Sequence, residues 1–92
     1  MRRSPTPQRA LGRAVGLRRR ELKLSPEEIA DGAELSKRTV EGIEAGKANP
    51  TGDTIDRIAR ALGLAHWELA KLADKLETKD RRPTNKPLRR PR

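Results

Sequence analysis

Three neighbouring residues in the middle of the chain, Lys37, Arg38 and Thr39, are of the types that recognise the edges of base pairs. Arg38 can donate two hydrogen bonds to O6 and N7 of a guanine, Lys37 can reach a guanine or a phosphate, and Thr39 can meet a thymine methyl group or a phosphate. Glu41 could accept a hydrogen bond from cytosine N4, while Gly42 has no side chain to offer. Lys37, Arg38 and Thr39 could instead be solvated surface residues, and Glu41 could be a solvated acid that helps solubility.

The residue types that catalysis or metal binding would need are scarce. The chain has one His and no Cys, and it contains neither a matching glycine-rich phosphate loop nor a convergent pair of carboxylates. We therefore expect no enzyme, no cofactor and no metal site, and we expect His66 to pack rather than to bind metal. The missing cysteines also argue against a disulfide-stapled secreted protein, so a cytoplasmic location is expected.

The net charge of +9 suits a polyanionic partner, either nucleic acid or an anionic membrane surface. The ends at 1–7 and 78–92 are rich in Pro and Arg, which predicts a flexible basic arm and a disordered basic tail around one domain at 8–77. Together the ends carry +2 and +6, so the domain, with 13 bases and 12 acids, is nearly neutral. No apolar run could form a signal segment or span a membrane, so membrane contact could only be peripheral.

Glycine and proline divide the domain into short segments that show no strand-like alternation, which predicts an all-α fold of five helices. The expected helices lie at about 8–22, 26–32, 37–45, 51–62 and 65–77. Ser25 and Ser36 are the expected N-cap residues of the second and third helices. Because Val40 and Ile43 would face the core, the third helix would turn Arg38, Glu41, Gly42 and Ala45 outward, with Lys37 and Thr39 on its flanks.

Residues 24–64 resemble the Cro and lambda-repressor-like, XRE-type family of helix-turn-helix domains. The match is carried by short strings in register: Leu24-Ser25, Glu28-Ile29-Ala30, Leu35-Ser36, Ile43-Glu44, Asn49-Pro50-Thr51 and Ala61-Leu62-Gly63-Leu64. The resemblance covers about 9–77 and implies that the second and third helices form the helix-turn-helix. It implies a sequence-specific transcriptional regulator, expected to be a nucleoid-associated repressor, that inserts helix 37–45 into the major groove of double-stranded DNA.

The resemblance also implies roles for individual residues. Base readout would come from Lys37, Arg38, Thr39, Glu41 and Gly42, and phosphate contacts from Ser25, Ser36, Lys47 and Asn49. Lys47 could equally be a solvated loop lysine. The operator would be an inverted repeat bound by a homodimer. Trp67, the single aromatic residue, is the candidate dimer contact, although it could instead cover the small core.

Arg19 and Glu44 are opposite charges at positions that face inward. Arg19 lies eight residues after Leu11 on the buried stripe of the first helix, and Glu44 lies one turn after Val40. The family joins an Arg and a Glu at these positions in a partly buried ion pair, so we expect a structural role for them.

Two departures from the family pattern affect the helix-turn-helix itself. Pro26 replaces the usual Gln, so a side chain that often braces a phosphate and the recognition helix is missing. Glu34 stands where a turn glycine is usual, so either Glu34 adopts a left-handed conformation or the bend has moved back to Gly32.

Two other functions remain open at the level of sequence. One is an antitoxin-like or other protein-interaction module that also binds DNA. The other is a sequence-tolerant nucleic-acid binder led by basic segments such as Arg2-Arg3, Arg81-Arg82 and Arg89-Arg90.

Overall fold

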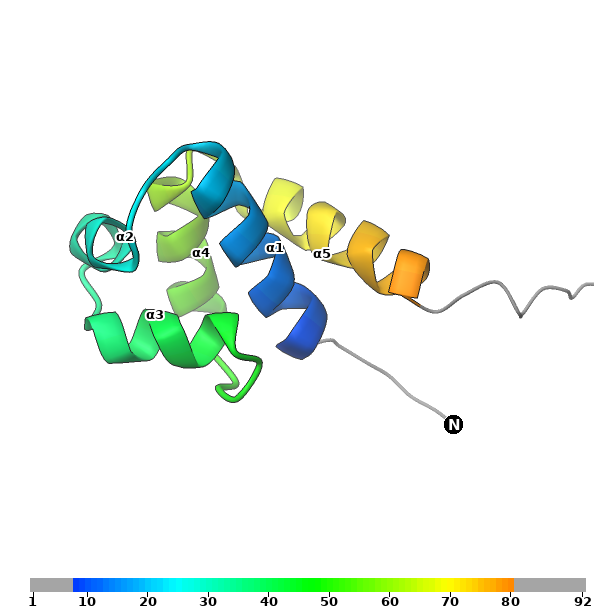
Figure 1. Cartoon of the computed structure of the whole chain (residues 1–92), viewed down its shortest axis with the longest axis horizontal. Helices are drawn as coiled ribbons and strands as arrows, with labels where there is room; N and C mark the ends of the chain where they lie inside the picture. The colour runs from blue at the N-terminus through cyan, green and yellow to red at the C-terminus, as the bar shows by residue number, and fades with distance from the viewer. Residues whose placement is uncertain (1–7, 81–92) are drawn as a thin grey trace, which may run out of the picture.

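The computed structural model describes residues 8–80, and every regular element in that range is an α-helix (Figure 1). The helices follow in the order α1 (Gln8–Glu21), α2 (Pro26–Ala33), α3 (Lys37–Glu44), α4 (Gly52–Ala61) and α5 (His66–Asp80). The expected all-α class with five helices is confirmed for this part of the chain. The expected flexible arm at 1–7, and residues 81–92 of the expected tail with their arginine pairs, lie outside the described residues.

Side-chain caps explain why three of the helices begin where they do. Ser25 Oγ accepts from Glu28 N at 3.1 Å, and Ser25 N donates to Glu28 Oε1 at 2.8 Å, which makes a complete capping box at the start of α2. Ser36 Oγ accepts from Thr39 N at 3.0 Å, and Thr51 Oγ1 accepts from Thr54 N at 3.2 Å. Each cap satisfies a backbone N–H that has no partner within its helix.

The turn between α2 and α3 is made at Glu34. This residue is the C-cap of α2 and has a left-handed backbone, with φ 59° and ψ 46°. Gly32 lies inside α2, so the alternative that the bend had moved back to it is wrong. Gly32 instead lets α4 come close, because a Cβ there would lie 3.3 Å from Ala61 Cβ.

The observed helix bounds differ from the expected ones by at most one residue, except at the end of α5. That helix continues to Asp80 instead of ending at residue 77, so it includes the first three residues of the predicted tail.

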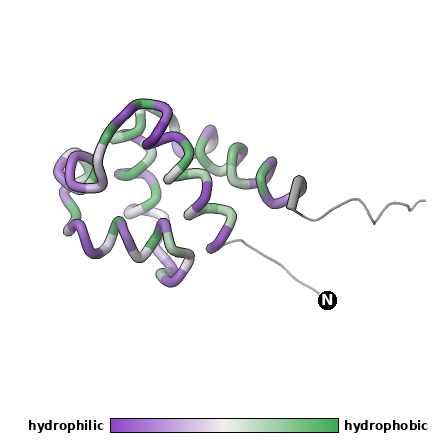
Figure 2. Tube along the Cα trace, viewed as in Figure 1, coloured by the Kyte–Doolittle hydropathy of each residue, from purple (hydrophilic) through white to green (hydrophobic). Residues whose placement is uncertain are grey.

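The core is small and entirely aliphatic, and all five helices contribute to it. Its buried members are Ala14, Val15, Ile29, Ala30, Ala33, Val40, Ile43, Ile58, Ala59, Leu62 and Leu69. Hydrophilic and hydrophobic residues alternate along each helix (Figure 2), as expected for helices with one buried face. None of the helices in the described range is both long enough and apolar enough to cross a membrane.

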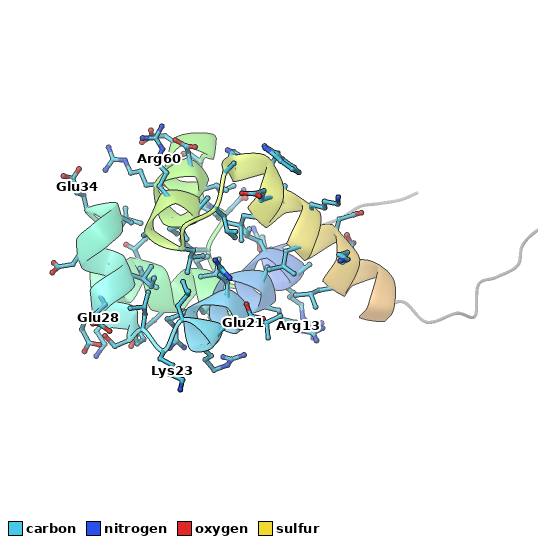
Figure 3. All side chains as sticks on the ribbon, turned by 90° about the horizontal axis from the view of Figure 1, so that it is seen from above. Arg13, Glu21, Lys23, Glu28, Glu34 and Arg60 are labelled. Carbon is cyan, nitrogen blue, oxygen red and sulfur yellow. The ribbon has the colours of Figure 1, made fainter. Side chains whose placement is uncertain are left out.

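The packing leaves α2 and α3 together at one end of the molecule (Figure 1). Helix α1 packs against α3 and α5, while α2 packs against α3 and α4. Seen from above, charged side chains such as Arg13, Glu34 and Arg60 project away from the helices (Figure 3). Because α3 is anchored on one side only, its opposite face is free to meet a ligand.

Candidate nucleic-acid interface

Helix α3 has a buried side and an exposed side, as the sequence pattern predicts. Val40 is fully buried and Ile43 is 2% exposed, which fixes the orientation of the helix. Lys37, Arg38 and Glu41 are exposed on the other side. The structure therefore brings three of the expected base-reading residues onto one surface.

The other two expected base-reading residues, Thr39 and Gly42, are half-buried. The Thr39 hydroxyl shares a 2.9 Å hydrogen bond with Ser36 Oγ, so it belongs to the helix cap. The Gly42 carbonyl accepts from Lys47 N at 3.0 Å and from Ala48 N at 3.3 Å. Gly42 thus supports the loop after α3 and offers little surface of its own.

The Lys37 ammonium is held by two carboxylates. Its Nζ lies 3.1 Å from Glu27 Oε2 and 3.8 Å from Glu41 Oε2. Hydrogen bonding to Glu27 raises the pKa of Lys37, and the same bond from Lys37 lowers the pKa of the Glu27 carboxyl. Sequence reasoning missed Glu27, because only the i, i+4 spacing of Lys37 and Glu41 is visible in a single sequence.

Arg38 differs from Lys37 in having no such partner. It is exposed, and no ion pair involves it within the described residues. Its guanidinium is therefore a free donor on the outward face of α3, with the fork geometry that suits a guanine edge or a phosphate.

The expected phosphate-binding residues lie around this surface. Ser25 and Ser36 sit at the starts of α2 and α3, where their oxygens already accept from backbone N–H groups. Lys47 and Asn49 are exposed in the loop that follows α3. Pro26 begins α2, so its missing N–H costs the helix nothing, but it provides no amide side chain to hold a phosphate.

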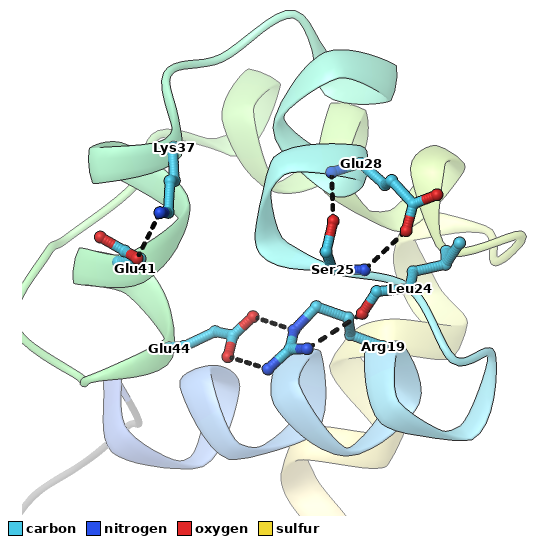
Figure 4. A network of polar contacts seen from close by, with 7 residues as sticks. All are labelled: Arg19, Leu24, Ser25, Glu28, Lys37, Glu41 and Glu44. Atoms are coloured by element: carbon cyan, nitrogen blue, oxygen red, sulfur yellow. Dashed lines mark hydrogen bonds and ion pairs between the residues drawn. The ribbon is translucent and has the colours of Figure 1, made fainter.

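Arg19 and Glu44 lie together behind the interface in a two-pronged ion pair (Figure 4). Arg19 Nε donates to Glu44 Oε2 at 2.7 Å, and Nη2 donates to Oε1 at 3.0 Å. The remaining nitrogen, Nη1, donates to Leu24 O at 3.0 Å. The hydrogen bond to Glu44 raises the pKa of Arg19. Through these three hydrogen bonds, the Arg19 guanidinium connects helix α1 to the end of α3 and to the segment that leads into α2.

Two glycines of α1 make this contact possible, and sequence reasoning missed them. A Cβ on Gly12 would lie against the carbonyl oxygens of Ile43 and Glu44, only 2.7 Å from the latter. A Cβ on Gly16 would lie 3.3 Å from Glu44 Oε1. Their spacing of four residues, within an otherwise regular helix, was the signal that two helices approach closely here.

The residues singled out on α5 are on the surface. Trp67 is 64% exposed, so the alternative that it covers the core is wrong. His66 is exposed as well, so the expectation that it packs is also wrong. Both residues lie in the first turn of α5, where Glu68 N donates to Ala65 O at 3.0 Å and Ala65 N donates to Glu68 Oε1 at 2.7 Å. In the part of the chain that the structure describes, no three His, Asp or Glu side chains gather as metal ligands would.

Comparisons with known proteins agree with this geometry. Residues 15–69 match the family model described as helix-turn-helix. An uncharacterised HTH-type transcriptional regulator of Sinorhizobium fredii is 38% identical over 56 residues, which cover 61% of this chain and 73% of that protein.

Solved structures show the same arrangement of helices. The restriction-modification controller protein C.AhdI of Aeromonas hydrophila has a TM-score of 0.66 at 29% identity, over 67% of this chain and 94% of that one. The controller protein C.Esp1396I, bound to a 25 base pair operator site, has a TM-score of 0.68 at 19% identity, over 74% and 90% of the two chains. With the family model spanning more than half of the sequence, the chain belongs to the XRE-type helix-turn-helix family of transcriptional regulators.

Proposed function

We propose that the chain binds double-stranded DNA in a sequence-specific way by inserting α3 into the major groove, and that it represses transcription by occupying its operator. The observation that carries this proposal is the outward face of α3, where Arg38 is exposed and unpaired while Val40 and Ile43 anchor the opposite side. Support also comes from C.Esp1396I, a protein of the same fold that has been seen on operator DNA. This role places the protein in the cytoplasm at the nucleoid.

We assign the residues separate roles on the DNA from the positions of their side chains. Arg38 reads a base edge, with Lys37 and Glu41 beside it on the same exposed surface. Lys47 and Asn49, exposed in the next loop, bind phosphates at the rim. The free N–H groups at the starts of α2 and α3 add phosphate donors that carry no sequence information. This assignment requires no catalytic residue and no cofactor.

The homodimer is a separate part of the proposal, and Trp67 supports it. Trp67 is a large apolar side chain that is 64% exposed, and Trp is enriched at protein interfaces. Two copies on an inverted repeat would place their α3 helices about 34 Å apart, in successive turns of the major groove. Replacing Trp67 with Ala should shift sedimentation equilibrium toward monomer, and an unchanged dimer would remove Trp67 from the interface.

The experiment for the proposed function is selection of bound duplexes from a random pool. We expect an enriched inverted repeat. Arg38→Ala should then weaken binding to the selected duplex by about 10-fold or more, the effect of losing a bidentate base contact, and weaken binding to random duplex much less. Arg60→Ala is the matched control, because Arg60 is an exposed arginine of α4 that pairs with Asp56.

Three outcomes would contradict the proposal in different ways. Equal losses on both duplexes would make Arg38 a phosphate contact. A selection without enrichment would favour a sequence-tolerant binder. Absence of DNA binding, together with a tight complex with a co-expressed protein, would favour a protein-interaction module.

A further inference from the structure

Lys37 stands at the junction of the two helices of the helix-turn-helix. It is the first residue of α3, and its Nζ reaches Glu27 Oε2 of α2 at 3.1 Å and Glu41 Oε2 of its own helix at 3.8 Å. About half of each side chain remains exposed, so the three groups are open to a ligand. Figure 4 shows the Lys37 ammonium turned back toward Glu41.

This group of three residues carries a net charge of −1, although it lies where a phosphate-rich ligand is proposed to bind. Arg38 and Lys47, two further cations that are proposed to meet DNA, have no ion pair within the described residues. Lys37 alone among these three cations is therefore already neutralised before DNA arrives.

The Glu27 carboxylate affects contacts of Lys37 with base edges and contacts of Lys37 with phosphates in different ways. A lysine ammonium has three N–H donors, so Lys37 can keep its contact with Glu27 and still donate to a neutral acceptor such as guanine O6 or N7. A phosphate is anionic, so a carboxylate on the same ammonium repels it. The arrangement thus opposes a phosphate contact while it permits a base contact.

We propose that Glu27 is a specificity-determining residue, which holds the Lys37 ammonium for a base edge and withholds it from the phosphate backbone. Phosphates are present on every duplex, whereas the right base edge is present only at the operator, so this restraint lowers binding to random DNA more than binding to the operator. The inference rests on the proposed function, and it assigns to Glu27 a positioning role that acts through Lys37.

The test compares wild type, Glu27→Gln, Lys37→Met and the double variant on the selected duplex and on random duplex. Glu27→Gln should raise affinity for random duplex by about twofold to fivefold, the range expected when one exposed ion pair is released. It should also steepen the plot of log K against log salt by about 0.9, the value for one additional phosphate contact. Affinity for the selected duplex should change less, so the ratio of affinity for the selected duplex to affinity for random duplex should fall.

The Lys37→Met background separates the proposed role from simple repulsion between Glu27 and DNA. In that background Glu27→Gln should leave the salt slope unchanged and lose most of its effect on affinity. Asp31→Asn is the control, since it removes the same charge one turn further along α2, at an exposed residue with no ion pair in the described range. It should change neither the ratio nor the slope.

The inference is overturned if Glu27→Gln leaves both the ratio and the slope unchanged, if its effect persists in full without Lys37, or if it weakens binding to random duplex. Failure of the proposed function would look different, because wild type itself would then show no preference for any selected duplex. The substitution keeps the capping box of Ser25 and Glu28, and circular dichroism would verify that the fold is retained.

Discussion

Helix α3 makes an ionic contact at each of its ends, and the two contacts differ in burial. At its last residue, Glu44 meets Arg19 with side chains 17% and 15% exposed. At its first residue, Lys37 meets Glu27 with side chains 50% and 60% exposed. Water can easily replace either partner in the exposed Lys37–Glu27 contact but hardly in the buried Arg19–Glu44 contact. The Arg19–Glu44 contact therefore holds the helix in place, and the Lys37–Glu27 contact is available to the proposed DNA ligand.

Removing the charge of Glu44 tests most directly whether the buried contact holds α3 in place. Glu44→Gln leaves Arg19 half-paired in a poorly hydrated site, and the free energy of unfolding should fall by roughly 3 kcal/mol. For a domain of this size that corresponds to about 12–24 °C in Tm. Thermal unfolding followed by circular dichroism would measure it, and an unchanged Tm would show that the pair does not hold α3.

The contribution of Arg19 to the pH dependence of stability has a definite sign. Because hydrogen bonding to Glu44 raises the pKa of Arg19 in the folded state, the stabilisation from Arg19 is complete below its ordinary pKa and is lost only as the pH rises through the raised value. Titration of Arg19 therefore leaves stability unchanged through the neutral and moderately alkaline range.

A second way to break the buried contact is to force α1 and α3 apart. Gly12→Ala would place a methyl group against the backbone oxygens of Ile43 and Glu44, and neither can move without shifting α3. We expect a loss of about 2 kcal/mol, measured by urea unfolding. Gly52→Ala is the control, because no heavy atom lies within 4 Å of a Cβ there, and it should be neutral or stabilising by up to about 1 kcal/mol. Equal effects of the two substitutions would contradict the close approach.

A substitution in the turn between α2 and α3 should raise the free energy of unfolding instead of lowering it. Glu34 has φ 59°, which is strained for a residue with a side chain, and its 3.8 Å contact with Arg57 is highly exposed. Glu34→Gly should therefore raise the free energy of unfolding by about 0.5–1 kcal/mol, as measured by chemical denaturation, and leave DNA affinity unchanged. A loss of stability would mean that the Glu34 side chain matters more than its backbone strain.

The smallest expected effect is a change in the titration of Glu27, which forms the exposed contact with Lys37. Because Lys37 lowers the pKa of Glu27, stabilisation from this pair is present above the ordinary pKa of a glutamate and is lost as the pH falls through the lowered value. Lys37→Met should raise the titration midpoint of the Glu27 carboxyl toward that of an isolated glutamate. NMR titration of the side-chain carboxyl would measure it, and an identical midpoint in both proteins would exclude the contact in solution.

The sequence predicted what depends on local patterns. Caps at Ser25 and Ser36 fixed the starts of α2 and α3, and the spacing of Val40 and Ile43 was enough to predict which face of α3 is exposed. The end of α5 at Asp80 was missed because its last turn lies in a segment rich in charged residues, which composition alone assigns to a tail.

Contacts between helices were harder to predict. Nothing local relates Glu27 to Lys37, since they belong to different helices and lie ten residues apart. Gly12 matters because of the backbone of α3, and its spacing from Gly16 indicates a close helix contact without showing which helix makes it. The exposure of Trp67 depends on the rotation of α5 about its axis, and an isolated aromatic residue does not determine that rotation.

The central claim is that the exposed face of α3 meets DNA while its buried end holds the fold. Chemical-shift mapping of the protein with its selected duplex tests this most directly. We predict the largest changes at the Arg38 side chain, the first turns of α2 and α3 and the loop at 47–49, with the Arg19–Glu44 contact intact in the complex. Changes concentrated on α5 around Trp67, with α3 unaffected, would contradict the account.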